Sequence, residues 1–331
     1  MTIRWTTRQT GLARFAFSGS VLLLLLGACG SSRQRPCQPE DAARFSDSSR
    51  MEEIVGFLAS DELGGRNTGT VGAELAASYL ENRLRQYGIA PYFGSYRDTL
   101  SNVGETAYNV VGFIPGSDPQ LAREFVVLGA HYDHIGRVAP VAADSIANGA
   151  NDNATGTATV LELARYFSGC RAPSRSLLIV FFGAEERGLL GSVHLAAKLK
   201  EQGFLLNAML NFEMTGVPMA GREYQVYLTG FGKSNLAEVA NGFASENLVG
   251  LLPEALEYNL FQRSDNYSFF NEFRVPAHTF STFDFSNYGY YHLPGDEASR
   301  MDYGHMSALL NKLIPVVQGI ANAPAGTLKL N

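Results

Sequence analysis

The chain has 331 residues, of which 46% are hydrophobic and 18% are charged, and its formal net charge is −6. This length suits one large globular domain or two small ones, and the apolar share is enough for a sizeable core. The acidic balance, with no basic cluster, excludes a sequence-independent nucleic-acid surface, so no nucleic-acid partner is expected.

Residues 1–28 have the pattern of an export signal. Three arginines precede the apolar run Val21–Leu26, and Leu26-Gly27-Ala28-Cys29 resembles the lipobox of bacterial lipoproteins, in which the cysteine is lipidated. The run is too short to span a bilayer, which takes about 20 apolar residues. We therefore expect an exported lipoprotein, in the periplasm or at the cell surface. Because no aspartate follows Cys29, an outer-membrane anchor is favoured.

Residues 29–45, rich in Ser, Arg, Gln and Pro, predict a tether, and a single folded domain is expected over 46–325. The first helix is predicted over about 48–59. Apolar residues at every third or fourth position then predict a helix from Val71 to Tyr87, which ends at Gly88. An oxidising compartment would permit a disulfide between Cys37 and Cys170, although free thiols are equally compatible with their spacing.

Short apolar runs in the rest of the chain predict buried strands separated by helices. The strands are expected near 108–114, 125–131, 176–182, 205–210, 224–229 and 275–280. One helix is predicted over about 154–167, and a closing helix carries apolar residues from Met306 to Ile320. Helical connections favour parallel strands. We therefore expect a three-layer α/β/α domain with a mixed, mostly parallel sheet.

Acidic and histidine side chains follow three of these strands at their carboxyl ends, and another acid precedes the helix at 154–167. They are His131, Asp133, Asp152, Glu185, Glu186 and Glu213. The carboxyl ends of parallel strands meet at one edge of a sheet, where open α/β folds bind their ligands. Nitrogen and oxygen donors of this kind suit zinc, so the sequence predicts a metal centre at this edge.

The two adjacent glutamates, Glu185 and Glu186, can have different roles in such a centre. Side chains of consecutive residues diverge, so one glutamate can hold a metal while the other acts as a general base on water. Asp133 is placed to orient His131, as carboxylates behind a metal ligand commonly do.

Four motifs occur in a fixed order along the chain. They are His131-x-Asp133, Gly149-Ala150-x-Asp152-Asn153-Ala154-x-Gly156, Gly183-Ala184-Glu185-Glu186-x-Gly188-Leu189-x-Gly191-Ser192 and Tyr291-His292-x-Pro294-x-Asp296. Together they resemble the motifs of the co-catalytic di-zinc aminopeptidase family, which also contains glutamate carboxypeptidase. The resemblance extends from the Leu63-x-x-Arg66 loop to the C-terminal helix.

This resemblance implies a zinc-peptidase-like (phosphorylase/hydrolase-like) fold, two Zn²⁺ ions and an aminopeptidase that acts on peptides. It places His131 and Glu213 on one zinc and Glu186 and His292 on the other. Asp152 would bridge the two ions, and Glu185 would be the general base. The family also implies a cis peptide bond between Asp152 and Asn153. Many members have aspartate where this chain has Glu213.

Other residues have weaker assignments. Tyr291, Asp265 and Phe269 are candidates for contacts with the substrate. The remaining histidines belong to none of the four motifs and are expected to be structural. They are His134, His194, His278 and His305. We expect a monomer.

Three alternatives remain. A carboxypeptidase for acidic C-terminal residues would need a basic pocket, for which the candidates are Arg222, Lys233, Arg263 and Arg274. A related single-zinc glutaminyl cyclase is disfavoured because the full ligand set is present. A non-catalytic binding lipoprotein with the same fold would be expected to have lost metal ligands.

Overall fold

The computed structural model describes residues 42–170 and 172–331, which form one compact unit. The predicted signal peptide, Cys29 and most of the tether lie outside these residues. The contacts of the unit continue past residue 325, because the Lys329 N–H donates to Asn235 Oδ1 and the Asn331 N–H donates to the Lys233 carbonyl.

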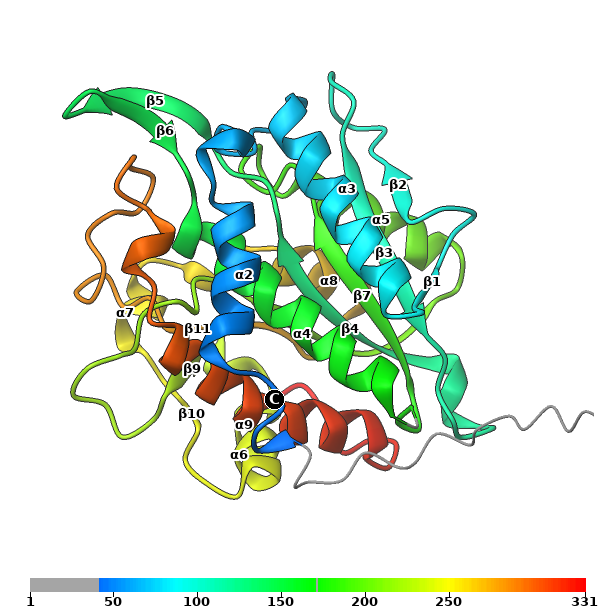
Figure 1. Ribbon diagram of the computed structural model, residues 1–331. Coiled ribbons are helices and arrows are strands. Elements are labelled where there is room, and N and C mark those ends of the chain that lie inside the picture. Colours follow the sequence, from blue (N-terminus) through cyan, green and yellow to red (C-terminus); the bar gives the residue numbers. More distant parts are fainter. Residues whose placement is uncertain (1–41, 171) are drawn as a thin grey trace, which may run out of the picture. The chain divides into compact units, whose positions relative to one another are not determined.

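A mixed sheet of nine strands forms the centre of the unit (Figure 1). Its strand order is β1-β3-β7-β4-β8-β11-β9-β10, with β2 beside β3. The bounds are β1 (Ala90–Pro91), β2 (Arg97–Thr99), β3 (Tyr108–Ile114), β4 (Glu124–His131), β7 (Ser176–Phe182), β8 (Leu205–Phe212), β9 (Val226–Leu228), β10 (Val249–Gly250) and β11 (Ala277–Ser281). β7, β4, β8 and β11 are parallel neighbours, whereas β3 and β9 run antiparallel to β7 and β11. The predicted mixed sheet is confirmed, with parallel pairing concentrated in its four central strands.

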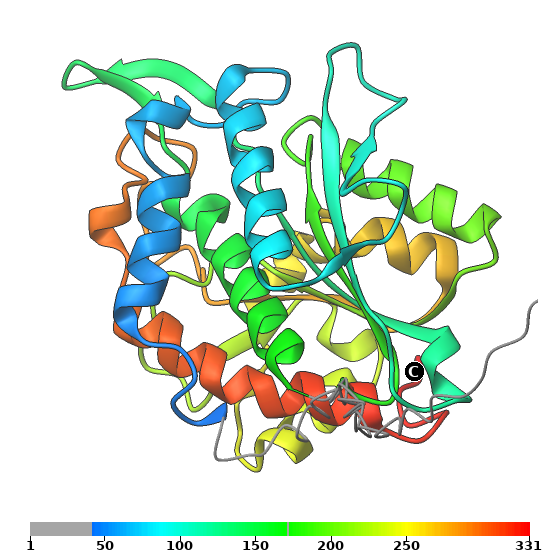
Figure 2. The same cartoon turned by 45° about the vertical axis from the view of Figure 1, so that its right-hand side comes forward.

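Helices cover both faces of the sheet (Figure 2). They are α2 (Ser48–Leu58), α3 (Val71–Gln86), α4 (Gly156–Gly169), α5 (Leu190–Glu201), α6 (Leu236–Ala244), α7 (Pro253–Glu257), α8 (Asn266–Phe273) and α9 (Tyr303–Asn322). Side-chain alternation along β7 defines the layers, because successive strand residues face opposite sides. Ile179 packs in the apolar cluster that contains residues of α2, α3, α4 and α9, and its neighbour Val180 packs with α5 and α8.

A two-stranded hairpin, β5 (Gly136–Val141) and β6 (Asp144–Ala147), was not predicted from the sequence. It stands apart from the main sheet and projects from the unit, at the upper left of Figure 1. Its position in the chain, between the end of β4 and the loop of Asp152, brings both of its ends close to the predicted metal centre.

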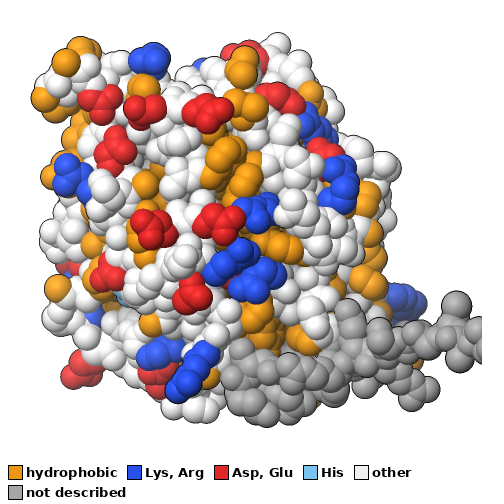
Figure 3. Space-filling model, in the orientation of Figure 1, with side chains coloured by type: hydrophobic (Ala, Val, Ile, Leu, Met, Phe, Trp, Pro, Cys, Tyr) orange, Lys and Arg blue, Asp and Glu red, His pale blue; other side chains and the backbone are white. Residues whose placement is uncertain are grey.

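Three further observations bear on location and partners. Cys170, which follows α4, is disulfide-bonded, and the other two cysteines of the chain lie outside the described residues. Within the described residues, no helix is long and apolar enough to cross a bilayer. On the face shown in Figure 3, acidic and basic side chains are intermixed rather than gathered into one basic patch.

Candidate metal centre

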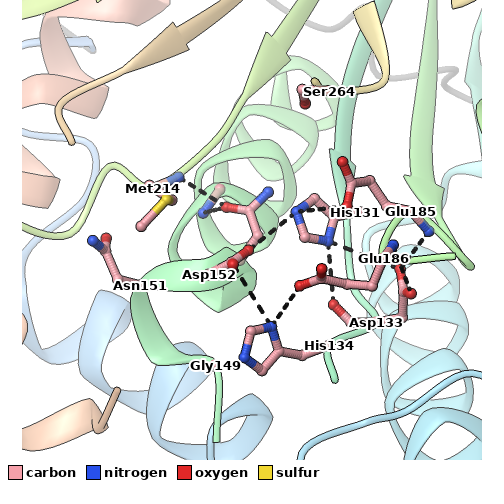
Figure 4. A network of polar contacts seen from close by, with 12 residues as sticks. His131, Asp133, His134, Gly149, Asn151, Asp152, Glu185, Glu186, Met214 and Ser264 are labelled. Carbon is pink, nitrogen blue, oxygen red and sulfur yellow. Dashed lines mark hydrogen bonds and ion pairs between the residues drawn. The ribbon is translucent and has the colours of Figure 1, made fainter. Parts of the chain in front are cut away.

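Predicted metal ligands lie together at the carboxyl edge of the parallel strands, where Figure 4 shows His131, Asp152 and Glu186. His131 ends β4, which lies between β7 and β8 in the sheet. Glu186 follows β7 and Glu213 follows β8, so these three side chains start from adjacent strand ends. Asp152 lies in the segment that precedes α4, and His292 comes from the loop between β11 and α9. Residues up to 161 positions apart in sequence therefore converge because the sheet places their strands side by side.

The donor atoms form two adjacent groups that share Asp152. His131, Asp152 and Glu213 make one group, and Asp152, Glu186, His292 and His134 make the other. His131 Nε2 lies 3.3 Å from Asp152 Oδ1, and His292 Nε2 lies 3.2 Å from both Asp152 Oδ2 and Glu186 Oε2. Tetrahedral zinc with bonds of 2.0–2.1 Å would separate neighbouring donor atoms by roughly 3.3 Å. The spacing thus fits a metal ion in each group.

Unpartnered polar atoms support the same conclusion. His131 Nε2, His292 Nε2 and Glu213 Oε2 are buried and have no hydrogen-bond partner among the described residues. An unpaired buried polar atom is costly, and such atoms are uncommon without a functional reason. The two imidazole nitrogens face the carboxylate of Asp152 at 3.2–3.3 Å, and imidazole nitrogen with carboxylate oxygen is a donor set that suits zinc.

The loop of Asp152 is held in place on both sides. On one side, the Asp296 carboxylate accepts the N–H groups of Asn151 (2.7 Å) and Asp152 (3.1 Å). On the other side, the Asn153 side chain donates to the Phe212 carbonyl of β8 at 3.0 Å. The peptide bond between Asp152 and Asn153 is cis, as the family resemblance implied.

Asp152 is kept ionised by its surroundings. Burial alone would disfavour its charged form, but three neighbouring imidazoles outweigh this effect and hold the pKa of Asp152 well below its usual range. They belong to His134, His131 and His292. A carboxylate that stays charged while buried is suited to bridging two cations.

Asp133 has a different partner from the one predicted. The Nδ1 of His131 contacts the backbone carbonyl of Asp133 at 3.2 Å, whereas the Asp133 carboxylate lies 3.8 Å away. That carboxylate instead accepts the N–H of Glu185 at 3.0 Å, the N–H of Glu186 at 3.4 Å and the Thr68 hydroxyl at 3.0 Å. Its side chain therefore positions the glutamate pair, and its main chain orients His131.

Glu185 lies beside the first donor group without belonging to it. Its Oε2 is 4.0 Å from His131 Nε2, and the side chain is 9% exposed. Burial, reinforced by the carboxylates of Glu213 and Asp265, raises the pKa of Glu185 well above its usual range. A carboxyl group with a raised pKa is suited to accept and return a proton near neutral pH.

His134, which was expected to be structural, lies at the site. Its Nδ1 lies 2.8 Å from Glu186 Oε1 (Figure 4). Its ring is 5.5 Å from that of His292 in an edge-to-face arrangement. The signal available in the sequence was its place three residues after His131, at the same strand end. Adjacency to a motif does not by itself reveal the direction of a side chain.

A cavity opens next to Glu213. Its apolar lining consists of Met214, Leu260, Phe283, Phe285 and the ring of Tyr291, and its polar lining includes Thr229, Ser264, Ser281 and Arg263. Tyr291, predicted to contact the substrate, lines this cavity, and its ring also stacks on His292 at 3.9 Å.

The other two predicted substrate residues do not line the cavity. Asp265 is fully buried next to Ser264, and burial raises its pKa to about 7. Phe269 is also fully buried, with its ring 5.8 Å from that of Phe182, so it belongs to the core between α8 and the sheet. An inward-facing aromatic residue of a helix has the same sequence pattern whether it meets core or cavity.

Only one of the four candidate basic residues reaches the cavity lining. Arg222 pairs with Glu254 at 3.6 Å, and Lys233 and Arg274 lie over the ring of Phe270. Arg263 lines the cavity and is the single cationic side chain among its lining residues.

Comparison with known proteins identifies relatives for most of the described unit. The model of peptidase family M28 matches residues 109–317. Leupeptin-inactivating enzyme 1 of Streptomyces exfoliatus is 28% identical over 232 residues, 69% of this chain and 48% of that protein. A probable leucine aminopeptidase of Arthroderma otae is 26% identical over 66% of this chain and 58% of its own length. The chain thus spans about half the length of the curated relatives it matches.

Solved structures show the same fold. The LapA aminopeptidase of Legionella pneumophila has a TM-score of 0.67 at 20% identity, covering 86% of this chain and 75% of its own. An aminopeptidase from Aneurinibacillus sp. strain AM-1 has a TM-score of 0.65 at 17% identity, covering 87% of this chain and 97% of its own. The predicted zinc-peptidase-like α/β/α fold is confirmed by these neighbours.

Proposed function

Because the chain belongs to peptidase family M28, we propose that it is a zinc-dependent aminopeptidase, which hydrolyses the first peptide bond of a peptide. One observation carries this proposal: two donor groups share Asp152, and the free carboxyl group of Glu185 lies beside them. The names of the relatives, which include leucine aminopeptidase and zinc metalloprotease, support the same activity and the same metal.

His131, Asp152 and Glu213 would hold one zinc ion, and Asp152, Glu186 and His292 would hold the other. Bound there, the ions would supply Lewis acidity that polarises the scissile carbonyl and makes water a stronger acid. Glu185 would remove a proton from the attacking water and later return it to the leaving amine. The hydrogen bonds from the Glu185 and Glu186 N–H groups to Asp133 would keep the general base at its place.

The cavity next to Glu213 supports a role in binding the side chain of the N-terminal residue. Its largely aromatic and aliphatic wall suits an apolar side chain. Arg263 at the same cavity favours a second candidate, a carboxypeptidase for acidic C-terminal residues, because a guanidinium group is well suited to bind a carboxylate.

A single set of assays separates these activities. Hydrolysis of a panel of aminoacyl-anilides, and of peptides with acidic C-terminal residues, would be measured with and without a chelator. We expect turnover of anilides with large apolar residues, abolished by chelation, and a decrease in kcat of at least about 10³-fold in Glu185→Gln, because proton transfer is lost. The variant should still bind metal.

Turnover of the acidic C-terminal peptides alone, with loss in Arg263→Ala but not in Arg274→Ala, would replace the aminopeptidase with the carboxypeptidase. Full metal occupancy without turnover of any peptide would instead favour a binding protein.

We further propose that the protein is an exported monomer, anchored through a lipid on Cys29 and favouring the outer membrane. The disulfide at Cys170 supports export, because disulfides persist in oxidising compartments. Both donor groups are complete within one chain, which supports a monomer. Growing cells with a radioactive fatty acid should label the wild-type protein but not the Cys29→Ser variant. Light scattering of the purified protein should give the mass of one chain. An unlabelled protein in the soluble fraction would contradict the anchor.

A further inference from the structure

We propose that His134 is a positioning residue that holds Glu186 to one metal through one oxygen; the inference rests on the function proposed above. His134 Nδ1 and Glu186 Oε1 are 2.8 Å apart. Since an ionised carboxylate can only accept, the imidazole must donate through Nδ1–H. The other oxygen, Oε2, is the one that lies 3.2 Å from His292 Nε2 in the donor group.

The distances distinguish a hydrogen-bond donor from a further metal ligand. The three donor pairs of the two groups have separations of 3.2–3.3 Å, near the roughly 3.3 Å that tetrahedral zinc requires. The His134 Nδ1 is closer than this to Glu186 and, at 3.8 Å, farther from Asp152 Oδ2. It therefore makes a hydrogen bond rather than sharing the metal, and the proton on Nδ1 leaves no lone pair there for coordination.

The surrounding structure fixes the His134 ring in this direction. The ring is fully buried, and the His134 N–H donates to the Arg66 carbonyl at 3.3 Å. Gly149 lies against the ring: a Cβ there would come within 2.6 Å of imidazole carbon atoms, and Gly149 has a positive φ of 62°. The glycine of the Asp152 loop thus makes room for the histidine that supports the neighbouring ligand.

A consequence for chemistry follows from the geometry. With Oε1 engaged by Nδ1–H, Glu186 offers a single oxygen to its metal instead of two. A coordination position then stays available for water or substrate, which a catalytic zinc site requires. Hydrogen-bonded partners behind a ligand typically contribute 10-fold to 100-fold in metal affinity.

Metal binding by two amide variants of the full-length protein tests the inference. The amide nitrogen of asparagine can occupy the place of Nδ1, whereas that of glutamine corresponds to Nε2 and points away from Glu186. We expect His134→Asn to bind two Zn²⁺ with affinities near those of the wild type. We expect His134→Gln to bind one Zn²⁺ normally and the other 10-fold to 100-fold more weakly. Competition for Zn²⁺ with a chromophoric chelator measures the affinities of both variants. After loading with cobalt, the visible spectrum of His134→Gln should differ from that of the wild type more than the spectrum of His134→Asn does.

The outcomes are distinct. Equal weakening in both variants, or in neither, would overturn the role of Nδ1–H. Unfolding of the metal-free variants, followed by circular dichroism, shows whether each one is folded before metal is added. Failure of the wild type itself to bind two metals would instead overturn the proposed function.

Discussion

At the scale of single residues, Glu185, the proposed general base, is positioned by a carboxylate that belongs to neither donor group, that of Asp133. Asp133 accepts two consecutive backbone N–H groups, those of Glu185 and Glu186, so one side chain sets the direction of both. The Thr68 hydroxyl donates to the same carboxylate and holds it in turn. Precise placement of a base matters because small displacements from the reacting atoms reduce rates steeply.

The variant Asp133→Asn tests this dependence. An asparagine retains one acceptor but turns an NH₂ group toward backbone donors, so the loop of Glu185 should shift. We expect kcat to fall about 10-fold to 100-fold while two metals remain bound. Steady-state kinetics and metal analysis would be compared with Asp144→Asn, a change on the exposed β5–β6 hairpin. An unchanged kcat in Asp133→Asn would show that the backbone of the loop is fixed by other contacts.

At the scale of elements, Arg66 joins three segments that are distant in sequence. Its buried guanidinium donates to the carbonyls of Tyr132 (2.7 Å), Asn148 (2.6 Å) and Gly149 (2.9 Å), and also to that of Leu58 at the end of α2. The end of β4 and the loop of Asp152 are thereby fastened to α2. Burial lowers the pKa of Arg66 to about 10, which leaves it charged at neutral pH.

Arg66→Lys should destabilise the protein by about 3 kcal/mol, because one ammonium group cannot reach four carbonyls and the remainder stay buried and unpaired. The free energy of unfolding in urea measures this loss. Arg85→Lys, at a side chain that is 59% exposed in an ion pair with Glu81, is the matched control and should change stability by less than about 0.5 kcal/mol. Equal effects of the two substitutions would contradict the role assigned to Arg66.

The junction of β11 with the chain after β9 should respond to pH. The Nδ1 of His278 contacts the Thr229 carbonyl and its Nε2 contacts the Ser234 hydroxyl, each at 2.8 Å. Burial lowers the pKa of His278 to about 4 from the ordinary 6.5. The unfolded chain then binds more protons than the folded protein between pH 6.5 and pH 4, so this residue stabilises the fold above pH 6.5 and loses that contribution as the pH falls.

Between pH 7 and pH 5 the free energy of unfolding of the wild type should fall by about 2 kcal/mol more than that of His278→Gln, which cannot titrate. Urea unfolding at a series of pH values measures the difference between the two proteins. Parallel curves would show that His278 does not remain neutral in the folded protein.

At the scale of the whole molecule, metal binding and stability should be coupled. The two donor groups contain three carboxylates, and Glu185, Asp133 and Asp265 lie close to them. Burial raises the pKa of several of these groups, which shows that their charges are poorly solvated in the fold. Two bound cations would offset this concentration of negative charge.

Chelation should therefore lower the free energy of unfolding. At a free metal concentration 1,000-fold above the dissociation constant, a ligand that binds only the folded state contributes about 4 kcal/mol per site. Urea unfolding with excess Zn²⁺, with chelator, and with Mg²⁺ added as a control for ionic strength would measure the effect. Identical unfolding curves in Zn²⁺ and chelator would contradict tight binding to the folded protein.

The sequence by itself determined the residues of the centre and the fold class. Strands near 125–131, 176–182 and 205–210 were recognisable as apolar runs, and the polar residues at their ends had to share one edge once the strands were parallel. His131, Glu186 and Glu213 converge for that reason, whereas Asp152 and His292 lie in loops, and the family resemblance implied their roles before the structure brought them to the same edge.

Only the tertiary structure decided which side chains support the centre. Whether His134 points at Glu186, whether Phe269 faces core or cavity, and whether the Asp133 carboxylate meets an imidazole or a backbone N–H all depend on contacts between segments far apart in sequence. Such contacts leave no periodic signal, because hydrophobic periodicity reports the face of an element and not its partner. Ligands could be found from their order along the chain, but their supports could be found only from their neighbours in space.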